Sequence, residues 1–167
     1  MPLHKVKVKP LTKEAFSPYG EMFEIPTENP VKVSDRYNFW PKLATMTINA
    51  GELQFGVSTF FKRPFRLDKM ERHYKSEEFM TPLTGPIIIP FAKHKGMDDD
   101  EIPNFNEVDA FLIKPTQGVI VRTGVWHWTP MPVEGTTSII CVFETGTEKT
   151  DVIIRPFPVG EVVELVL

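Results

Sequence analysis

The segment from Met70 to Gly85, MERHYKSEEFMTPLTG, concentrates residues whose types suit acid–base or metal chemistry. Glu71 and His73 are two residues apart, and Glu78 follows His73 by five. In a β-strand, residues i and i+2 point to the same face, so we expect Glu71 and His73 to project together. Imidazoles and carboxylates move protons or ligate divalent ions. The alternative is a solvated surface strand that happens to carry charge.

A second histidine with notable neighbours is His127, in the segment GVWHWTP. Trp126 and Trp128 flank it, and an aromatic ring there would either contact a substrate or pack in the core. We take Trp126 as a candidate substrate contact, with core packing as the alternative. The other two histidines, His4 and His94, are interpreted as ordinary hydrogen-bonded side chains.

The elements that must hold these residues are short strands, because 16 prolines are spread along the 167 residues and proline interrupts helices. Only Leu11–Gly20 favours a helix of about one turn, with Thr12 as its N-cap and Pro18 just beyond its end. His4–Lys9, in which basic residues alternate with valines, predicts a solvated edge strand. Apolar and β-branched runs predict further strands at Thr45–Asn49, Gln54–Phe61, Pro86–Phe91, Val108–Lys114, Gly118–Arg122, Thr136–Glu144, Asp151–Phe157 and Glu161–Val166.

Many short strands joined by turns predict an all-β sandwich or barrel, built as one domain over residues 1–167. A net charge of −3 gives no electrostatic reason to expect nucleic acid or an anionic membrane as a partner. The single cysteine, Cys141, lies among apolar neighbours and is interpreted as a core thiol, so we expect a cytoplasmic protein without disulfides. The polar stretch Lys93–Asn106, with its acidic run Asp98–Glu101, is expected to be a solvated loop.

The Met70–Gly85 segment resembles the first cupin motif, whose usual pattern is G-x5-H-x-H-x3-4-E-x6-G. His73, Glu78 and Gly85 match the spacing of its second histidine, its glutamate and its final glycine. Glu71 stands where the first histidine would be, and Phe65 stands where the leading glycine would be.

The segment GVIVRTGVWHWTP resembles the second cupin motif, usually G-x5-P-x-G-x2-H-x3-N. Gly124 and His127 fit its G-x2-H core, whereas Arg122 replaces the proline and Met131 replaces the asparagine. The opening glycine, Gly118, is two residues too close. Together the two motifs favour a cupin-type double-stranded β-helix, a jelly-roll barrel with one short N-terminal helix.

Over nearly its full length the chain resembles the ureidoglycolate lyase family of cupins. The family's E-R-H run maps onto Glu71, Arg72 and His73. Its W-H pair maps onto Trp126 and His127. The segments that carry the resemblance are Pro10–Glu21, Met70–Gly85, Asp109–Val119 and Gly124–Pro130.

The chain departs from this family at three positions that we expect near the pocket. Glu78 stands where the family usually has Gln, Trp128 where it often has a second His, and Val121 where it has Tyr. These changes leave the expected fold intact, but they could change which substrate the pocket accepts.

The resemblance implies release of urea from ureidoglycolate, a molecule in which one carbon carries a hydroxyl, a carboxylate and a nitrogen of urea. A base must take the hydroxyl proton, and an acid must supply a proton to the departing nitrogen. We expect Glu71, His73 and His127 in these catalytic roles. The substrate carboxylate needs a cation opposite it, for which Lys62 and Arg122 are the candidates.

A divalent transition ion (Ni, Mn, Zn or Fe) is the one cofactor that these residues favour, and no organic cofactor is expected. The two histidines and two glutamates would form an N2O2 ligand set with open positions for substrate: Glu71, His73, Glu78 and His127. Without an ion the two carboxylates would repel, and the pKa of one would rise to leave a general acid. In either case Glu78 is expected to contact the substrate, together with Trp126.

Two other functions compete with the lyase. One is a metal-dependent cupin enzyme acting on another small hydroxy or keto acid, and the other is a cupin that binds a small molecule without turnover. We expect Arg72 to form a salt bridge rather than to act in catalysis. By analogy with other cupins we expect a homodimer paired through an edge strand, with His4–Lys9 as that edge.

Overall fold

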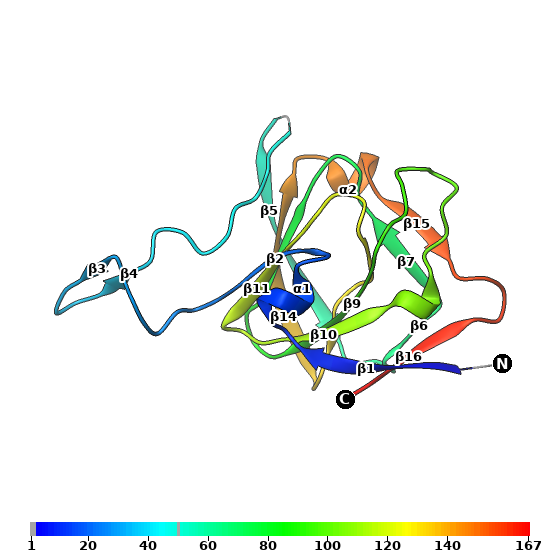
Figure 1. Ribbon diagram of the computed structural model, residues 1–167, viewed down its shortest axis with the longest axis horizontal. Helices are drawn as coiled ribbons and strands as arrows, with labels where there is room; N and C mark the ends of the chain where they lie inside the picture. The colour runs from blue at the N-terminus through cyan, green and yellow to red at the C-terminus, as the bar shows by residue number, and fades with distance from the viewer. Residues whose placement is uncertain (1–2, 50) are drawn as a thin grey trace.

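The computed structural model describes residues 3–49 and 51–167, which fold into two facing β-sheets and a small hairpin held away from them (Figure 1). The first sheet has nine strands in the order β15-β7-β12-β9-β10-β1-β16-β6, with β13 paired to β9. The second has five, in the order β2-β11-β8-β14-β5, and β3 and β4 form the hairpin. This is the mainly-β, cupin-type architecture that the sequence predicts.

The strands and helices have the following bounds: β1 Leu3–Pro10, α1 Lys13–Phe16, β2 Gly20–Glu24, β3 Lys32–Val33, β4 Asn38–Phe39, β5 Leu53–Phe61, β6 Arg66–Leu67, β7 Lys69–Arg72, β8 Glu78–Pro82, β9 Ile87–Ala92, the 3-10 helix η1 Phe105–Glu107, β10 Asp109–Ile113, β11 Gln117–Val121, β12 Trp126–His127, β13 Met131–Pro132, β14 Thr136–Glu144, α2 Thr147–Thr150, β15 Ile153–Pro156 and β16 Val162–Val166.

Seven of the eight strands predicted from apolar runs are present, and the one predicted at Thr45–Asn49 is wrong. There the backbone N–H of Thr45 donates to the carboxylate of Glu21 at 3.2 Å, and that of Thr47 donates to Glu77 at 2.6 Å. Because carboxylates take the place of a neighbouring strand as acceptors, the segment is held in position without joining a sheet.

The first strand, β1, is not the edge strand that the sequence suggested. It lies between β10 and β16, and it runs parallel to both. Val6 and Val8 are buried while Lys5 and Lys7 are exposed, so the alternation reflects one covered face of an internal strand. The pairing of two copies through this strand is therefore not the arrangement that the fold offers.

The predicted N-terminal helix is present as α1, and the Oγ1 of its N-cap Thr12 accepts from the N–H of Ala15 at 3.2 Å. The sequence missed a second helical turn, α2. It begins after Gly146 in the left-handed region (φ 88°) without a side-chain cap, and four residues are too few for a periodic apolar pattern. In the described part of the chain, no helix has the length and apolar character needed to cross a bilayer.

Two apolar clusters form the core, one on each face of the nine-stranded sheet. Between the sheets, Phe16 packs edge-to-face against Phe91 and Phe111, with ring centroids 5.1 and 5.6 Å apart. The strand β9 is buried on both faces and contributes to both clusters, which explains its unbroken apolar run. Cys141 is buried in the first cluster, as predicted.

The loop at residues 93–106 is tied to the sheet by Arg72, a fully buried side chain of β7. Its guanidinium lies between the rings of Tyr74 and Trp126, at 4.5 and 4.1 Å from their centroids. It also forms an ion pair with Glu101 at 2.5 Å. The expected salt bridge of Arg72 is confirmed, whereas the expectation that this acidic run is wholly solvated is wrong at Glu101 because that carboxylate neutralises a buried cation.

Candidate active site

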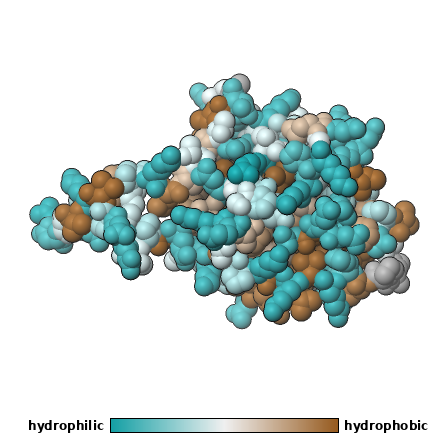
Figure 2. Space-filling model, in the orientation of Figure 1, coloured by the Kyte–Doolittle hydropathy of each residue, from teal (hydrophilic) through white to brown (hydrophobic). Residues whose placement is uncertain are grey.

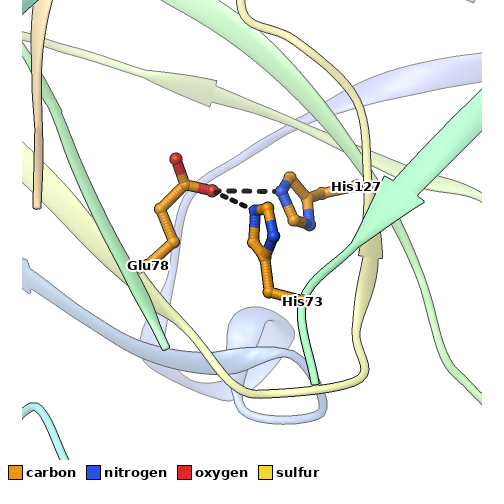
Figure 3. A group of neighbouring side chains, drawn as sticks. All are labelled: His73, Glu78 and His127. Carbon is orange, nitrogen blue, oxygen red and sulfur yellow. Dashed lines mark ion pairs between the residues drawn. The ribbon is translucent and has the colours of Figure 1, made fainter. Parts of the chain in front are cut away.

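Three of the predicted side chains meet at one point between the sheets (Figure 3). Glu78 is the first residue of β8, and its Oε2 lies 3.0 Å from Nε2 of His127 and 3.5 Å from Nε2 of His73. His127 ends β12, and His73 follows directly after β7. One ligand atom from each side chain lies within 4.8 Å of the others, so the group has the dimensions of a metal centre.

Both imidazoles are oriented by backbone carbonyls. The Nδ1 of His73 lies 2.6 Å from the carbonyl oxygen of Asp151, and the Nδ1 of His127 lies 3.0 Å from that of Val125. A carbonyl only accepts, so each Nδ1 carries the proton and each Nε2 is directed to Glu78.

Glu71 lies beside this group and outside it. Its Oε1 is 4.0 Å from Nε2 of His127, and its side chain is 20% exposed. Glu71 and His127 are paired across β7 and β12, which fixes their proximity. The structure therefore brings all four predicted ligands to one place but separates one carboxylate from the other three residues.

Two members of the group, Glu78 and His127, line a cavity of about 320 Å³, whereas His73 lies behind them and is not part of its lining. Its walls come from β5, β7, β8, β12, β14 and the chain that follows β12: Ser58, Phe60, Glu71, Glu78, Met80, His127, Trp128, Thr129, Pro130, Ile139, Cys141 and Phe143. Trp128, one of the departures from the family, thus lines the cavity, and Val121, another, is paired with Glu78 across β11 and β8. A larger groove between β2 and the hairpin contains none of the predicted site residues.

The buried contacts shift two pKa values in opposite directions. Burial lowers the pKa of His73, but its contact with the carboxylate of Glu78 outweighs burial and raises that pKa to about 9. Burial raises the pKa of Glu78, but its contacts with His127 and His73 lower it to about 2. Glu78 is therefore an ionised carboxylate, and is not the protonated acid that repulsion between two carboxylates would produce.

The donor set fits a divalent transition ion. Two imidazole nitrogens and one carboxylate oxygen converge, and Nε2 of His127 is a buried atom that has no hydrogen-bond partner of good geometry among the described residues. An ion held by these three residues would satisfy that nitrogen, and it would replace the protonated ring of His73 as the positive charge beside Glu78.

Three residues predicted to bind substrate do not line the cavity. Lys62 is exposed. Arg122 donates from Nη1 to the carbonyl of Ser17 at 2.8 Å, near α1. Trp126 is fully buried against Arg72 in the second core cluster, as its packing alternative required. Substrate contact by these three side chains stays a prediction that their positions do not favour.

Sequence reasoning missed two residues that shape the site. Arg63 donates to the carbonyls of Thr129 and Pro130 at 2.9 Å each, and so holds one wall of the cavity. Asp151 contacts His73 from 78 residues away. A basic residue at the end of a predicted strand was a weak signal for Arg63, and no local pattern marks Asp151.

The family model described as ureidoglycolate lyase matches residues 3–163. The chain belongs to the ureidoglycolate lyase family. It is 30% identical over 154 residues to a ureidoglycolate lyase of Pseudomonas paraeruginosa, with 87% of this chain and 86% of that protein covered. It is 28% identical over 146 residues to one of Agrobacterium fabrum, with 84% and 85% covered.

Solved structures with a similar arrangement include QdtA, a sugar 3,4-ketoisomerase from Thermoanaerobacterium thermosaccharolyticum, with a TM-score of 0.46 and 12% identity over 79% of this chain and 85% of that one. A dTDP sugar isomerase from Desulfovibrio desulfuricans has a TM-score of 0.45 and 12% identity over 84% and 86% of the two chains.

Proposed function

We propose that the chain is a ureidoglycolate lyase that splits ureidoglycolate into glyoxylate and urea during allantoin breakdown. Membership of the family supports this proposal. The observation that carries it is the cavity whose wall includes Glu71, which lies beside and outside the group His73, Glu78 and His127. We propose further that residues 1–167 act as one domain and that the protein is cytoplasmic.

The reaction needs one proton to move as one bond breaks. Glu71 takes the proton of the substrate hydroxyl, the C–O bond becomes a carbonyl, and the electron pair of the C–N bond leaves with the urea nitrogen. The carboxyl of Glu71 then returns the proton to that nitrogen, so the carboxylate is restored and no other reactant is consumed. Its partial exposure at the cavity wall gives it access to substrate.

His73, Glu78 and His127 would hold a divalent ion, Ni²⁺, Mn²⁺, Zn²⁺ or Fe²⁺, without an organic cofactor. When bound, the ion supplies Lewis acidity and a positive charge opposite the substrate carboxylate. A substrate carboxylate in this cavity would need such a positive charge, because the described residues that line it include two glutamates and neither Lys nor Arg. The imidazole ring of His73 must release its Nε2 proton before it can ligate.

The test is urea release from ureidoglycolate by purified protein, with and without a chelator and with added Ni²⁺. Release well above the spontaneous rate supports the lyase, and its loss on chelation assigns the ion a role in turnover. Turnover of another hydroxy or keto acid, with no urea, would support the alternative metal-dependent enzyme. Stabilisation by a ligand without turnover would support the binding protein.

A homodimer remains our proposal, with a different interface from the one first expected. The edge strand β5 directs Ser58 and Phe60 to the cavity, while Phe55 and Val57 on its other face are 78% and 68% exposed. A sheet face in water is usually polar, so this apolar face favours a covered surface.

The hairpin arm, residues 25–49, supplies a matching apolar surface on the same chain. It projects from the two sheets (Figure 1), and its apolar side chains are visible in Figure 2. Val31 is 76% exposed and Val33 69%. Since one chain carries both an apolar sheet face and an apolar arm, a second copy placed about a two-fold axis would bury each against the other.

A further inference from the structure

Asp151 contacts both the ring of His73 and the turn that leads from His73 to Glu78. Its carbonyl oxygen lies 2.6 Å from the Nδ1 of His73. Its side chain is buried, and accepts from three successive backbone N–H groups. These are Tyr74 to Oδ1 at 2.8 Å, and Lys75 and Ser76 to Oδ2 at 2.7 and 3.2 Å.

Asp151 lies far from His73 in the sequence, and strand pairing brings the two residues together. Asp151 follows α2, where its N–H donates to the carbonyl of Thr147 at 2.9 Å, and it precedes β15. The pairing of β15 with β7 sets Ile153 opposite Arg72, so the residue two positions earlier meets the chain just after His73.

The turn at residues 74–76 has a second anchor that keeps its N–H groups in line. The Oγ of Ser76 accepts from the N–H of Glu144, the last residue of β14, at 2.8 Å. Consecutive N–H groups converging on one oxygen pair form a concave anion site, and here the anion is a side chain of the protein itself. The carboxylate of Asp151 therefore accepts from three consecutive N–H groups of the turn that separates two candidate ligands.

We propose that Asp151 is a positioning residue of the active site, whose carboxylate sets the turn between His73 and Glu78 and whose carbonyl holds the Nδ1 proton of His73. The proposal rests on the proposed function for its catalytic meaning. Its structural content, the tautomer and orientation of one imidazole, is independent of any reaction. Removal of a residue that is hydrogen-bonded to a metal ligand typically weakens metal affinity by about 10- to 100-fold.

The test compares Asp151→Ala and Asp151→Asn with Asp109→Ala. Asp109 is a suitable control because its carboxylate also accepts two hydrogen bonds, from Tyr19 at 2.7 Å and Lys9 at 2.6 Å, but does not line the cavity. The first measurement is the ¹⁵N NMR spectrum of the four histidines in metal-free protein, assigned with His73→Gln. The second is the Kd for Ni²⁺.

In the native protein and in Asp109→Ala, we expect a slowly exchanging Nδ1–H signal from His73. Asp151→Ala keeps the backbone carbonyl but removes the carboxylate that holds the turn next to His73, so the ring should lose its fixed position against that carbonyl. The Nδ1–H signal should then exchange rapidly, and the Kd for Ni²⁺ should rise about 10- to 100-fold. Asp151→Asn keeps a side-chain carbonyl as an acceptor for the turn. Its exchange rate and its Kd should therefore lie between those of the native protein and those of Asp151→Ala. If Asp151→Ala fails to fold, Asp151→Asn is judged by the same two measurements.

An unchanged His73 signal together with an unchanged Kd in both variants would overturn the proposal and leave Asp151 as a cap of α2. If the native protein binds no Ni²⁺, or releases no urea, the proposed function fails, and the NMR comparison still decides the role of Asp151.

Discussion

The site and the arm at residues 25–49 differ in how far their side chains are buried. At the site, His73 and Glu78 are largely buried, and the turn between them is hydrogen-bonded to Asp151. In the hairpin of the arm, backbone contacts are local, such as the N–H of Val31 to the carbonyl of Phe39 at 2.9 Å, and apolar side chains such as Val31 and Val33 are exposed. The end of the arm, at Thr45 and Thr47, is hydrogen-bonded to other segments. One chain is sufficient to define the geometry of the site, whereas the arm has surface left to bury against a partner.

Glu71→Gln should produce the largest effect on the site. It removes the carboxylate that we propose as the base, so we expect urea release to fall by about 10²- to 10⁴-fold while circular dichroism stays native. The Kd for Ni²⁺ should change little, because Glu71 lies outside the three-residue group. Glu77→Gln is the matched control, since that carboxylate is bonded to the N–H of Thr47. Full activity in Glu71→Gln would contradict the assignment of the base.

Glu78→Gln replaces the carboxylate that we propose as a ligand by the Gln that the family resemblance leads us to expect at this position. We expect the affinity for Ni²⁺, measured by competition with a chelator, to fall at least about tenfold, because the amide carries no charge to balance the ion. Urea release should fall with metal content. Activity that survives without bound ion would show that the ion is not catalytic.

The affinity for Ni²⁺ should depend on pH through His73. Its pKa in the folded protein is raised to about 9, so the proton on Nε2 competes with the ion below that value. We expect the affinity to rise by up to about tenfold per pH unit from pH 6.5 to 9. Isothermal titration across this range is the measurement, and a flat profile would refute the idea.

The same shift affects the stability of the metal-free protein. Because the folded pKa of His73 lies above its ordinary value of about 6.5, the stabilisation is fully present below pH 6.5. It is lost as pH rises through 9. Urea unfolding at pH 6 and pH 9.5, with His73→Gln as the control, should show this difference in the native protein alone.

Val57→Asp should have the smallest effect on folding and a clear one on assembly. Val57 is exposed on the outer face of β5, so we expect the free energy of unfolding of a protomer to change by about 0.5 kcal/mol or less. Light scattering should show a dimer converted to a monomer. Val159→Asp, in a fully exposed turn, should leave the dimer intact. A native monomer, or a dimeric Val57→Asp, would argue against the interface.

Local patterns in the sequence determined much of the protein. The spacing of His73, Glu78 and His127 in two short motifs identified three side chains that meet in space, because motif spacing places each at a strand end. Apolar and β-branched runs located seven strands, and proline and threonine signals bounded α1. Each of these features depends on neighbours within a few residues.

Other features were decided only by the tertiary structure. Strand order made β1 internal, and carboxylates from other segments accept from the backbone N–H groups of Thr45 and Thr47. The contact of Asp151 with His73 and the ion pair of Arg72 with Glu101 join segments far apart in the chain. Such contacts depend on how the two sheets pack on each other, which cannot be predicted from the spacing of residues along the chain. The sequence therefore specified which side chains could act, and the closed sheets specified which of them share a cavity and what holds them there.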